Sequence, residues 1–357
     1  MNDTESRVLI PRQTAIPELV RVKAGALDRM GIYAERYGFR RIFLFFSAGL
    51  DSQLLERLTA SLRSRKIELL KKTQVESVSF EATIELFRQS PGSAEAVIGV
   101  GGGKALDVAK YIAFLLRLPY LSVPTSLSND GFCSPQSSLT VENRRRTVPS
   151  AMPFGVVLDT AVSLNAPESL WHSGVGDLVS KFTAITDWKM AFHATGAHFD
   201  DFAALLSDAS VYQFMARPNR DIEGMRLLGT ALLLNGISMS ICGSSRPASG
   251  SEHLISHALD SIGKRPRLHG LQVGVATYLM SLLQGQNSER IAALFAATGF
   301  WQEIAHDPFD RGEWLEAVRL APSIKSDFYT VLSSRDCVPE IQRSLDSDPN
   351  LRQCFKA

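Results

Sequence analysis

Three histidines and one aspartate in the second half of the chain have the side-chain types of a divalent-metal site. His253 and His257 are four positions apart, so they share one face if their segment is helical. His269 follows after a turn-like segment, and Asp177 lies upstream in a Gly-Val-Gly-Asp sequence. Two imidazoles and one carboxylate form a known ligand set that leaves a position open for substrate. The spacing alone leaves an alternative open, in which the paired histidines are packed core residues or one face of a solvated helix.

Three consecutive glycines follow an apolar segment at residues 96–100 that has the pattern of a buried strand. Glycines at the carboxyl end of a parallel strand let the backbone approach a pyrophosphate, whose charge is held by the free N–H groups of the next helix. The predicted phosphate-binding residues are Gly101, Gly102, Gly103 and Lys104. The segment is neither a Gly-x-Gly-x-x-Gly sequence nor a Walker loop, so a tight turn without a ligand is the alternative.

Hydroxyl groups and one carboxylate follow the next predicted strand, at residues 120–123. The carboxyl ends of parallel strands meet at one edge of a sheet, so this segment faces the same ligand as the glycines. We expect Thr125 and Ser126 to bind polar groups of the cofactor and Asp130 to orient a substrate hydroxyl. A plain Asn-Asp-Gly turn is the competing interpretation.

The elements that position these residues alternate between helix and strand patterns in the first half of the chain. This alternation predicts a parallel sheet covered on both faces. Predicted helices span residues 17–37, 52–64, 81–88 and 105–116, and predicted strands span 41–46, 75–80, 96–100, 120–123 and 154–159. Segments 138–141 and 146–148 have the pattern of a hairpin.

The second half has an almost wholly helical pattern. Predicted helices cover residues 199–215, 222–243, 250–261, 270–284, 287–297 and 312–322, and the Gly-Val-Gly-Asp sequence is expected to open another helix. Ser249 and Glu252 have the spacing of a capping box, which predicts a helix that begins just after Ser249. The predicted fold is an α/β Rossmann-like domain over residues 1–165 and an all-α domain over residues 166–357, with a small-molecule site between them.

Composition and charge exclude several classes of protein. The 357 residues are 45% hydrophobic and 21% charged, and 38 Lys and Arg residues oppose 37 Asp and Glu residues. The net charge of +1 argues against a protein that binds nucleic acid through bulk charge, and the Arg144–Arg146 cluster is interpreted as a solvated turn. The apolar run at 227–243 falls short of the ~20 residues that span a bilayer and is interpreted as a buried helix.

The four cysteines are scattered and form neither a disulfide framework nor a Cys-x-x-Cys metal site. This usage favours a reducing, cytoplasmic location, and the polar N-terminus lacks the apolar core of a signal peptide. We expect a soluble protein that acts on a small molecule, without membrane or nucleic-acid partners.

Five segments, in order along the chain, resemble one enzyme family. The sequence from Gly101 to Lys110 is similar to the cofactor loop of the superfamily that unites dehydroquinate synthase, glycerol dehydrogenase and iron-containing alcohol dehydrogenases. Four more segments narrow the resemblance to the glycerol-1-phosphate dehydrogenase branch, in its bacterial form. They are Ser122–Gly131, Gly174–Asp177, Ser244–His257 and Leu268–Gly274.

The resemblance implies a dehydroquinate synthase-like fold and reversible, NAD(P)H-dependent reduction of dihydroxyacetone phosphate to sn-glycerol 1-phosphate. It implies a divalent ion (zinc, nickel or iron) held by Asp177, His253 and His269, with His257 near the nicotinamide to handle a proton or support the site. Asp107 lies within the cofactor loop and is expected to contribute to cofactor binding. Relatives form dimers or octamers, so a homo-oligomer is expected.

Substrate recognition departs from the branch at one position. Arg246 stands where dehydroquinate synthases have a substrate-binding arginine, which predicts that it grips a phosphate or carboxylate. The alternative is a helix-terminal arginine that binds the last carbonyls of the preceding helix. Gln136 replaces the arginine that usually follows Ser-Pro in this branch, so one cationic contact is missing, and Lys181 is a candidate to restore the charge.

Three other functions compete with this one. The first is a reductase of a related unphosphorylated polyol ketone, and the second is a dehydroquinate-synthase-like lyase that uses NAD transiently. Such lyases have a glutamate as the metal carboxylate, so Asp177 counts against that function. The third is a catalytically silent binding protein on the same scaffold. An unusual first cofactor loop, Ser47–Ser52, leaves the choice between NADH and NADPH open.

Overall fold

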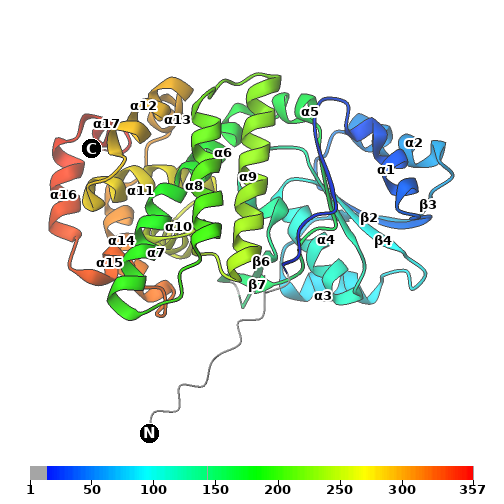
Figure 1. The fold of residues 1–357 in the computed structure, drawn as a ribbon, viewed down its shortest axis with the longest axis horizontal. Helices are drawn as coiled ribbons and strands as arrows, with labels where there is room; N and C mark the ends of the chain where they lie inside the picture. The colour runs from blue at the N-terminus through cyan, green and yellow to red at the C-terminus, as the bar shows by residue number, and fades with distance from the viewer. Residues whose placement is uncertain (1–13, 143, 357) are drawn as a thin grey trace, which may run out of the picture.

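The structure is a computed structural model that describes residues 14–142 and 144–356. One part of the chain forms a sheet with helices on both faces, and the rest forms a cluster of helices beside it (Figure 1). The sheet has six parallel strands in the order β1-β8-β5-β4-β2-β3. They are β1 (Leu19–Val22), β2 (Arg41–Ser47), β3 (Glu68–Val75), β4 (Ala96–Gly101), β5 (Tyr120–Pro124) and β8 (Gly155–Leu158). The predicted fold class is confirmed.

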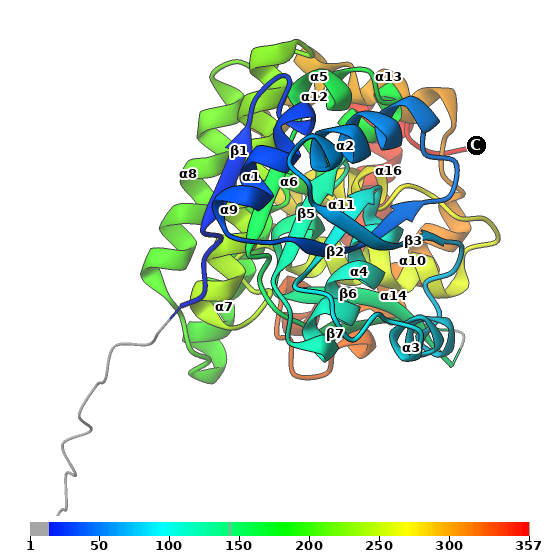
Figure 2. The same cartoon turned by 90° about the vertical axis from the view of Figure 1, so that its right-hand side faces the viewer.

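Helices cover both faces of the sheet, as Figure 2 shows. One face carries α1 (Met30–Arg36) and α2 (Ser52–Ser64), and the other carries α3 (Phe80–Arg88) and α4 (Gly103–Leu116). Side chains of β2 alternate between the two layers: Ile42 packs toward α1 and α2, whereas Phe43 packs toward α3 and α4. A strand buried on both faces is a continuous apolar run, which is why the sequence pattern predicts β2 and β4.

Two predictions for the first half are wrong. The predicted helix at 17–37 is instead β1, a short 3-10 turn and α1. β1 forms because Leu19 pairs with Gly155 of β8, a partner so distant in sequence that no local pattern reveals it. The predicted strand at 75–80 is instead the end of β3 and the start of α3. β3 lies at the edge of the described sheet, where solvent-facing polar residues obscure a strand pattern.

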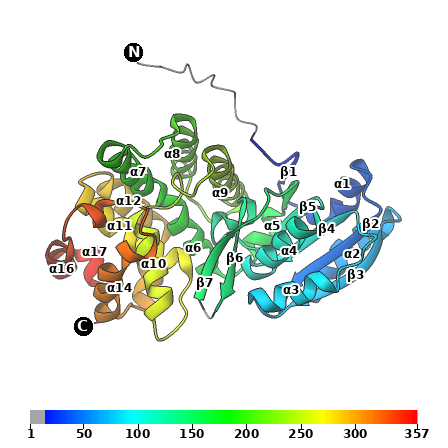
Figure 3. The same cartoon turned by 90° about the horizontal axis from the view of Figure 1, so that it is seen from below.

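An antiparallel hairpin extends from the sheet toward the helical part (Figure 3). Its strands, β6 (Gln136–Val141) and β7 (Arg144–Pro149), confirm the predicted hairpin. β6 packs on α3 and α4, and β7 contacts α10 (Ser251–Ile262) of the second half. The hairpin therefore connects the two parts of the molecule beside the cavity described below.

The regular elements described after β8 are helices. They are α5 (Thr160–Leu164), α6 (Glu168–Val179), α7 (Lys181–Thr195), α8 (Asp201–Met215), α9 (Ile222–Cys242), α10 (Ser251–Ile262), α11 (His269–Gln284), α12 (Ser288–Thr298), α13 (Phe300–His306), α14 (Arg311–Ile324), α15 (Val331–Ser334), α16 (Val338–Ser347) and α17 (Pro349–Arg352). Each of the six helices predicted by range overlaps one of these. The predicted domain boundary at 165 falls in the link between α5 and α6, and the division into two domains stays a prediction.

Helix α9 is long and apolar enough to cross a membrane by length and composition, but 61% of its most apolar window is buried inside the fold. Leu228 and Leu232 are fully buried in the large core of the helical part, and α9 packs along α8. This is the buried helix that the sequence predicts. All four cysteines are free and buried.

Two helix starts differ from the prediction. The Gly-Val-Gly-Asp sequence lies inside α6 and does not open a helix, because Gly174 packs against the Leu127 backbone and Gly176 lies where α6 meets α11. Helix α10 begins at Ser251, with Gly250 as the N-cap, and the predicted capping box of Ser249 and Glu252 does not form. The Glu252 carboxylate accepts a hydrogen bond from the Gly250 N–H at 2.6 Å, but the Ser249 side chain caps nothing.

Candidate metal and coenzyme site

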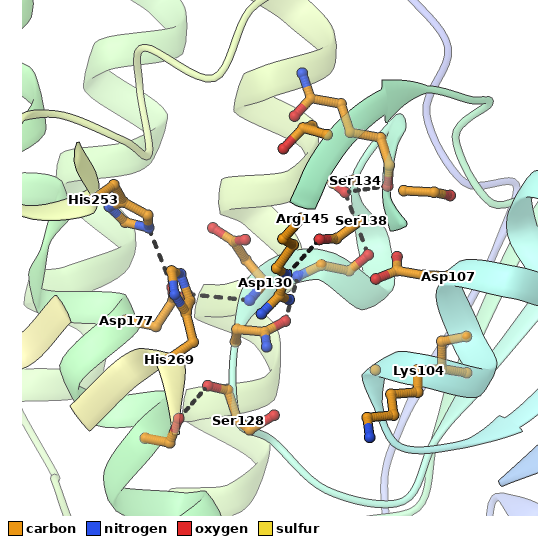
Figure 4. Close-up of a pocket in the computed structure, with 18 of the residues that line it drawn as sticks. Lys104, Asp107, Ser128, Asp130, Ser134, Ser138, Arg145, Asp177, His253 and His269 are labelled. Carbon is orange, nitrogen blue, oxygen red and sulfur yellow. Dashed lines mark hydrogen bonds and ion pairs between the residues drawn. The ribbon is translucent and has the colours of Figure 1, made fainter. Parts of the chain in front are cut away.

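A cavity of about 460 Å³ lies where the carboxyl ends of β4 and β5 face α6, α10 and α11 (Figure 4). Its walls combine the glycine loop, the turn after β5, the aspartate and all three histidines. The predicted site residues that line it are Gly102, Gly103, Lys104, Asp107, Ser126, Asp130, Asp177, His253, His257 and His269. Residues far apart in sequence thus meet in one place.

The three expected metal ligands come from three different helices. Asp177 of α6, His253 of α10 and His269 of α11 each offer one ligand atom, and these atoms all lie within 4.8 Å of one another. The Nε2 atoms of His253 and His269 are 3.6 Å and 4.0 Å from the same Asp177 oxygen. This spacing suits three ligands around one ion.

The outer nitrogens of both imidazoles are occupied, which tests whether the inner nitrogens can bind a cation. His253 Nδ1 lies 2.9 Å from the Glu252 carboxylate, and His269 Nδ1 lies 2.9 Å from the Ser256 hydroxyl. That hydroxyl donates to Gln272 at 2.8 Å, so it accepts from His269. Each ring therefore carries its proton on Nδ1 and directs an unprotonated Nε2 at the centre of the triad, as metal-binding histidines do. The residues fit a divalent cation.

The charge states agree with this arrangement. Burial, together with the charge of His253, lowers the pKa of His269 to about 3, so His269 is neutral at physiological pH. Burial by itself would raise the pKa of Asp177, but Lys181 and His253 outweigh it and hold that pKa well below its usual value. Asp177 thus offers an anionic ligand and His269 a neutral one, whereas burial of His253 is outweighed by its contacts with Asp177 and Glu252, which raise its pKa, so a cation would compete with a proton there.

Lys181 and Asp130 are paired beside the triad. The fully buried Lys181 ammonium lies 2.9 Å from Asp130 Oδ2 and 3.6 Å from Asp177 Oδ2, and it donates to the Ala248 carbonyl at 3.1 Å. The Asp130 N–H also donates to Asp177 Oδ2 at 3.1 Å. Burial and the neighbouring Asp177 raise the pKa of Asp130. The positive charge of Lys181 thus lies near the site, but it already forms ion pairs with Asp130 and Asp177.

His257 lies one helical turn from His253 and lines the cavity without joining the triad. Its ring centre is 5.8 Å from that of His269 and 6.4 Å from that of His253. Burial, followed by the charges of His269 and His253, lowers the pKa of His257 well below its usual value. A neutral imidazole therefore stands beside the candidate ion, close to where a substrate would bind.

The glycine loop has the geometry of an anion-binding turn. Gly101 has φ +130°, and a Cβ there would lie 2.1 Å from the Ser47 hydroxyl, so only glycine fits. Helix α4 then starts at Gly103 with no side-chain cap, and a Cβ on Gly102 or Gly103 would meet only open space. The first N–H groups of α4 thus face the cavity, where they can bind a phosphate group.

A second cavity of about 580 Å³ adjoins this loop on the sheet side. Thr125 lines it, whereas Gly102, Ser126 and Leu170 line both cavities. An extended dinucleotide can therefore pass from one cavity to the other across the glycines. Asp107, expected to bind the cofactor, lies 3.3 Å from the Lys110 ammonium, so its carboxylate also forms an ion pair within α4.

Lys110 is a functional residue that the sequence analysis missed. It is fully buried and donates to the Gly131 carbonyl at 2.7 Å, which fixes the turn that carries Asp130 against α4. Its place within the Gly101–Lys110 motif was a usable signal, because a lysine on the buried face of an apolar helix requires a polar partner.

The structure does not bring Arg246 into the cavity. Its guanidinium donates to the backbone carbonyls of Tyr329 at 2.7 Å and Asp327 at 3.4 Å, and it stacks 3.6 Å from the centre of the Phe328 ring. These carbonyls belong to the segment after α14. Arg246 therefore does not bind the last carbonyls of the preceding helix, α9, as the alternative interpretation proposed. The predicted anion contact at Arg246 has no support from its position.

Three other cations line the cavity and were not predicted: Arg145, Arg267 and Lys325. Arg145 was interpreted as part of a solvated turn, but the alternation of β7 places Arg145 and Thr147 on the cavity side. That alternation was a usable signal. Lys325 is the C-cap of α14, directly after Ile324, and lines the cavity from there. No sequence motif predicts this position.

Comparison with known proteins defines the class first. The iron-containing alcohol dehydrogenase family model matches residues 21–167. The structure of a probable glycerol dehydrogenase from Sinorhizobium meliloti matches with a TM-score of 0.73 at 18% identity, covering 95% of this chain and 100% of that one. A sulfoacetaldehyde reductase from Bifidobacterium kashiwanohense, in complex with NAD+, matches with a TM-score of 0.70 at 15% identity, covering 95% and 100%. The fold is that of the iron-containing alcohol dehydrogenases.

Closer relatives define the family. The glycerol-1-phosphate dehydrogenase [NAD(P)+] of Aeropyrum pernix is 35% identical over 339 residues, which are 92% of this chain and 96% of the relative. The same enzyme of Methanothermobacter thermautotrophicus is 33% identical over 340 residues, 94% and 97% of the two chains. The chain belongs to the glycerol-1-phosphate dehydrogenase family and is an NAD(P)-dependent dehydrogenase. Its assignment to the bacterial form of the family stays a prediction.

Proposed function

We propose that this protein catalyses the reversible, NAD(P)H-dependent reduction of dihydroxyacetone phosphate to sn-glycerol 1-phosphate. The observation that carries the proposal is the triad of Asp177, His253 and His269, which opens onto the same cavity as the glycine loop. The relatives named as glycerol-1-phosphate dehydrogenases match 92% and 94% of the chain.

A divalent ion held by the triad would polarise the ketone oxygen, and a nicotinamide bound across the glycines would supply hydride. The chain itself supplies position, charge and a hydrogen-bond donor. Lys181 offsets the charge of Asp130, whose side chain lines the cavity and can accept a hydrogen bond from a substrate hydroxyl. The neutral His257 can hold a proton at a ring nitrogen beside the alcohol oxygen that forms on reduction.

The ligand set of the triad is compatible with several divalent metals. Two imidazoles and one carboxylate bind zinc, nickel or iron, and supply and geometry select among these ions. We propose a single divalent ion per chain. Elemental analysis of protein loaded with each metal in turn gives the number of ions bound, and the coenzyme assay on the same samples identifies the metal that supports the highest kcat.

Absorbance at 340 nm tests the function. We expect steady oxidation of NADH or NADPH with dihydroxyacetone phosphate, and much slower oxidation with dihydroxyacetone. A preference for the unphosphorylated ketone would instead support a polyol-ketone reductase. Product formation from a sugar phosphate without net coenzyme turnover would support the lyase, and no reaction with any of these compounds would support the silent binding protein.

We also propose that the protein is a cytoplasmic homo-oligomer. Four free, buried cysteines are typical of a reducing compartment. Neighbouring helices α7 and α8 expose Phe192 (48%), Phe202 (61%) and Leu205 (64%), an apolar surface that a second copy could cover. Light scattering on the purified protein distinguishes a monomer from a dimer or an octamer.

A further inference from the structure

Four cationic side chains line the main cavity, and they differ in how far other groups already engage them. Arg267 already has partners within the protein: it lies 3.2 Å from Asp307 Oδ2 and stacks 4.2 Å from the centre of the Phe309 ring. Lys104 stands on the first turn of α4, beside the coenzyme loop. The other two cations, Arg145 and Lys325, have no assigned role.

Lys325 is a largely buried cation with only weak partners among the described residues. Its ammonium lies 3.5 Å from the Ser245 hydroxyl and 4.9 Å from the centre of the Phe328 ring, and no carboxylate of the described residues comes within ion-pair distance. Burial lowers its pKa, and the attraction of Asp327 offsets only part of that effect. An anionic ligand at this point of the cavity would offset that cost.

Arg145 faces the same space from the hairpin. Its Nε donates to the Ser138 hydroxyl at 2.6 Å, and its Nη1 lies 3.7 Å from Asp260 Oδ2 on α10. These contacts orient the guanidinium, while half of the side chain remains accessible. Part of its hydrogen-bonding fork is therefore free to bind a ligand in the cavity.

The two cations and His257 line the same cavity. The positive charges of Lys325 and Arg145 both contribute to the lowered pKa of the His257 ring. Gln136, on the other strand of the hairpin, lines the same cavity and carries no charge, so Arg145 is the cation that the hairpin presents to it.

We propose that Arg145 and Lys325 together bind the phosphate group of the substrate, next to His257, while the ketone lies at the metal triad. This rests on the proposed function and adds to it the residues that distinguish a phosphorylated from an unphosphorylated ketone. A guanidinium and an ammonium complement a phosphate dianion, and charge-assisted hydrogen bonds of this kind are roughly twice as strong as neutral ones. A three-carbon ketone phosphate is short enough for both ends to lie in one cavity of about 460 Å³.

Arg246 acts in this scheme as a positioning residue. It clamps the segment that follows Lys325, by binding the carbonyls of Asp327 and Tyr329 and by stacking on Phe328. The same aromatic ring contacts the Lys325 ammonium. Loss of the clamp would displace Lys325 from the cavity without removing any group that touches the substrate.

The test compares Arg145→Gln and Lys325→Gln with the wild-type protein loaded with metal. Loss of one charge-assisted contact of about 1.5–3 kcal/mol corresponds to a change on the order of 10–100-fold. We therefore expect KM for dihydroxyacetone phosphate to rise by that factor in each variant. The ratio of kcat/KM for dihydroxyacetone phosphate to that for dihydroxyacetone should fall in parallel. Arg146→Gln is the matched control, since Arg146 is on the same strand, is exposed and does not line the cavity.

Binding of inorganic phosphate, measured by calorimetry on the metal-loaded protein, keeps this test separate from the proposed function. Phosphate binding that is lost in both variants supports the subsite even if the wild-type protein fails to reduce dihydroxyacetone phosphate, an outcome that would refute the proposed function alone. Unchanged phosphate binding and an unchanged substrate ratio in both variants, with circular dichroism and metal content as in wild type, would overturn the subsite. Lys325→Arg and Arg145→Lys, which keep the charge, should retain most of the preference, and loss of preference there would count against a charge-based contact.

A double-mutant cycle tests the role of Arg246. We expect Arg246→Lys to raise KM for dihydroxyacetone phosphate with little change in kcat. The same substitution should have little further effect when Lys325 is already glutamine, because the two residues act as one unit. Equal effects of Arg246→Lys in both backgrounds would show that it does not act through Lys325.

Discussion

Asp177 is the residue on which the candidate site converges. Its two oxygens face His253 and His269 on one side and Lys181 on the other, at distances of 3.6, 4.0 and 3.6 Å. It is almost fully buried, and the charges around it hold its pKa well below the usual value, so it is ionised throughout the physiological range. No other anionic ligand is present in the triad.

We expect Asp177→Asn to lose bound metal and at least ~100-fold in kcat/KM, because the neutral amide keeps the shape but removes the one negative ligand. Elemental analysis and the coenzyme assay measure the two effects. The fold should persist, since Lys181 retains Asp130 as its partner. Asp201→Asn, an exposed substitution on α8, is the control, and metal content equal to wild type in Asp177→Asn would refute the ligand assignment.

Glu252 holds His253 in place. Its Oε1 accepts from His253 Nδ1 at 2.9 Å and its Oε2 accepts from the Thr183 hydroxyl at 2.8 Å, with both groups buried. Carboxylates in this position fix the orientation of a metal-binding imidazole, and their loss costs 10–100-fold in metal affinity.

We therefore expect Glu252→Gln to weaken metal binding about 10–100-fold while leaving kcat close to wild type at saturating metal. Competition with a fluorescent chelator measures the affinity. A variant that binds metal as tightly as wild type would show that the Glu252 contact has no role in orienting His253.

The residues at this scale were only partly predictable. The glycine loop and the His253–His257 pair carry local spacing signals, whereas Asp177, His253 and His269 were predicted as the ligand set from the family resemblance. Lys325 and the clamp formed by Arg246 have no such signal, because each depends on how a segment near residue 328 folds back over the helical part. A guanidinium bound to backbone carbonyls looks no different in sequence from one that binds a ligand.

At the scale of elements, the site depends on a close crossing of α6 and α11. A Cβ on Gly176 would lie 2.0 Å from the Gly270 carbonyl oxygen, and one on Gly270 would lie 1.8 Å from the Ser173 carbonyl oxygen. Only glycine allows the two helices to approach this closely. The approach brings Asp177 of α6 next to His269 of α11.

We expect Gly176→Ala to reduce both stability and metal affinity. Alanine gains about 0.5–1 kcal/mol of helix propensity, but a backbone clash in a packed interior costs typically 1–3 kcal/mol or more, so the clash decides the sign. Chemical denaturation and metal titration measure the two quantities. Gly312→Ala in α14 is the control, because its nearest neighbour is a side-chain oxygen at 3.2 Å that can shift. Unaltered metal affinity in Gly176→Ala would show that metal binding does not depend on the close crossing of α6 and α11.

Sequence patterns predicted most elements but not this crossing. Helices such as α9 and α11 carry long apolar patterns, whereas the glycines of α6 look like a helix start when taken locally. The role of Gly176 becomes clear only from the partner helix, where Gly270 lies about a hundred residues further along the chain. The wrong predictions at β1 and β3 have the same origin, since both strands depend on partners that local patterns do not contain.

At the scale of the whole molecule, each half supplies what the other lacks. The sheet part presents the glycine loop and the hairpin with Arg145, and the helical part presents the triad and Lys325. The ion pair between Arg145 and Asp260 connects the two across the cavity. Solved structures below 20% identity share this architecture.

Because the triad joins α6, α10 and α11, a bound ion should stabilise the folded helical part as well as serve the reaction. An ion that binds the native state alone stabilises it by about 2.7 kcal/mol when its free concentration is 100 times Kd. For a chain of 357 residues this corresponds to a rise in Tm on the order of 4 °C. Scanning calorimetry of chelator-treated protein, with and without added zinc, measures the shift. Asp177→Asn should show little or none of it, and an equal rise in wild type and variant would mean that the ion binds elsewhere.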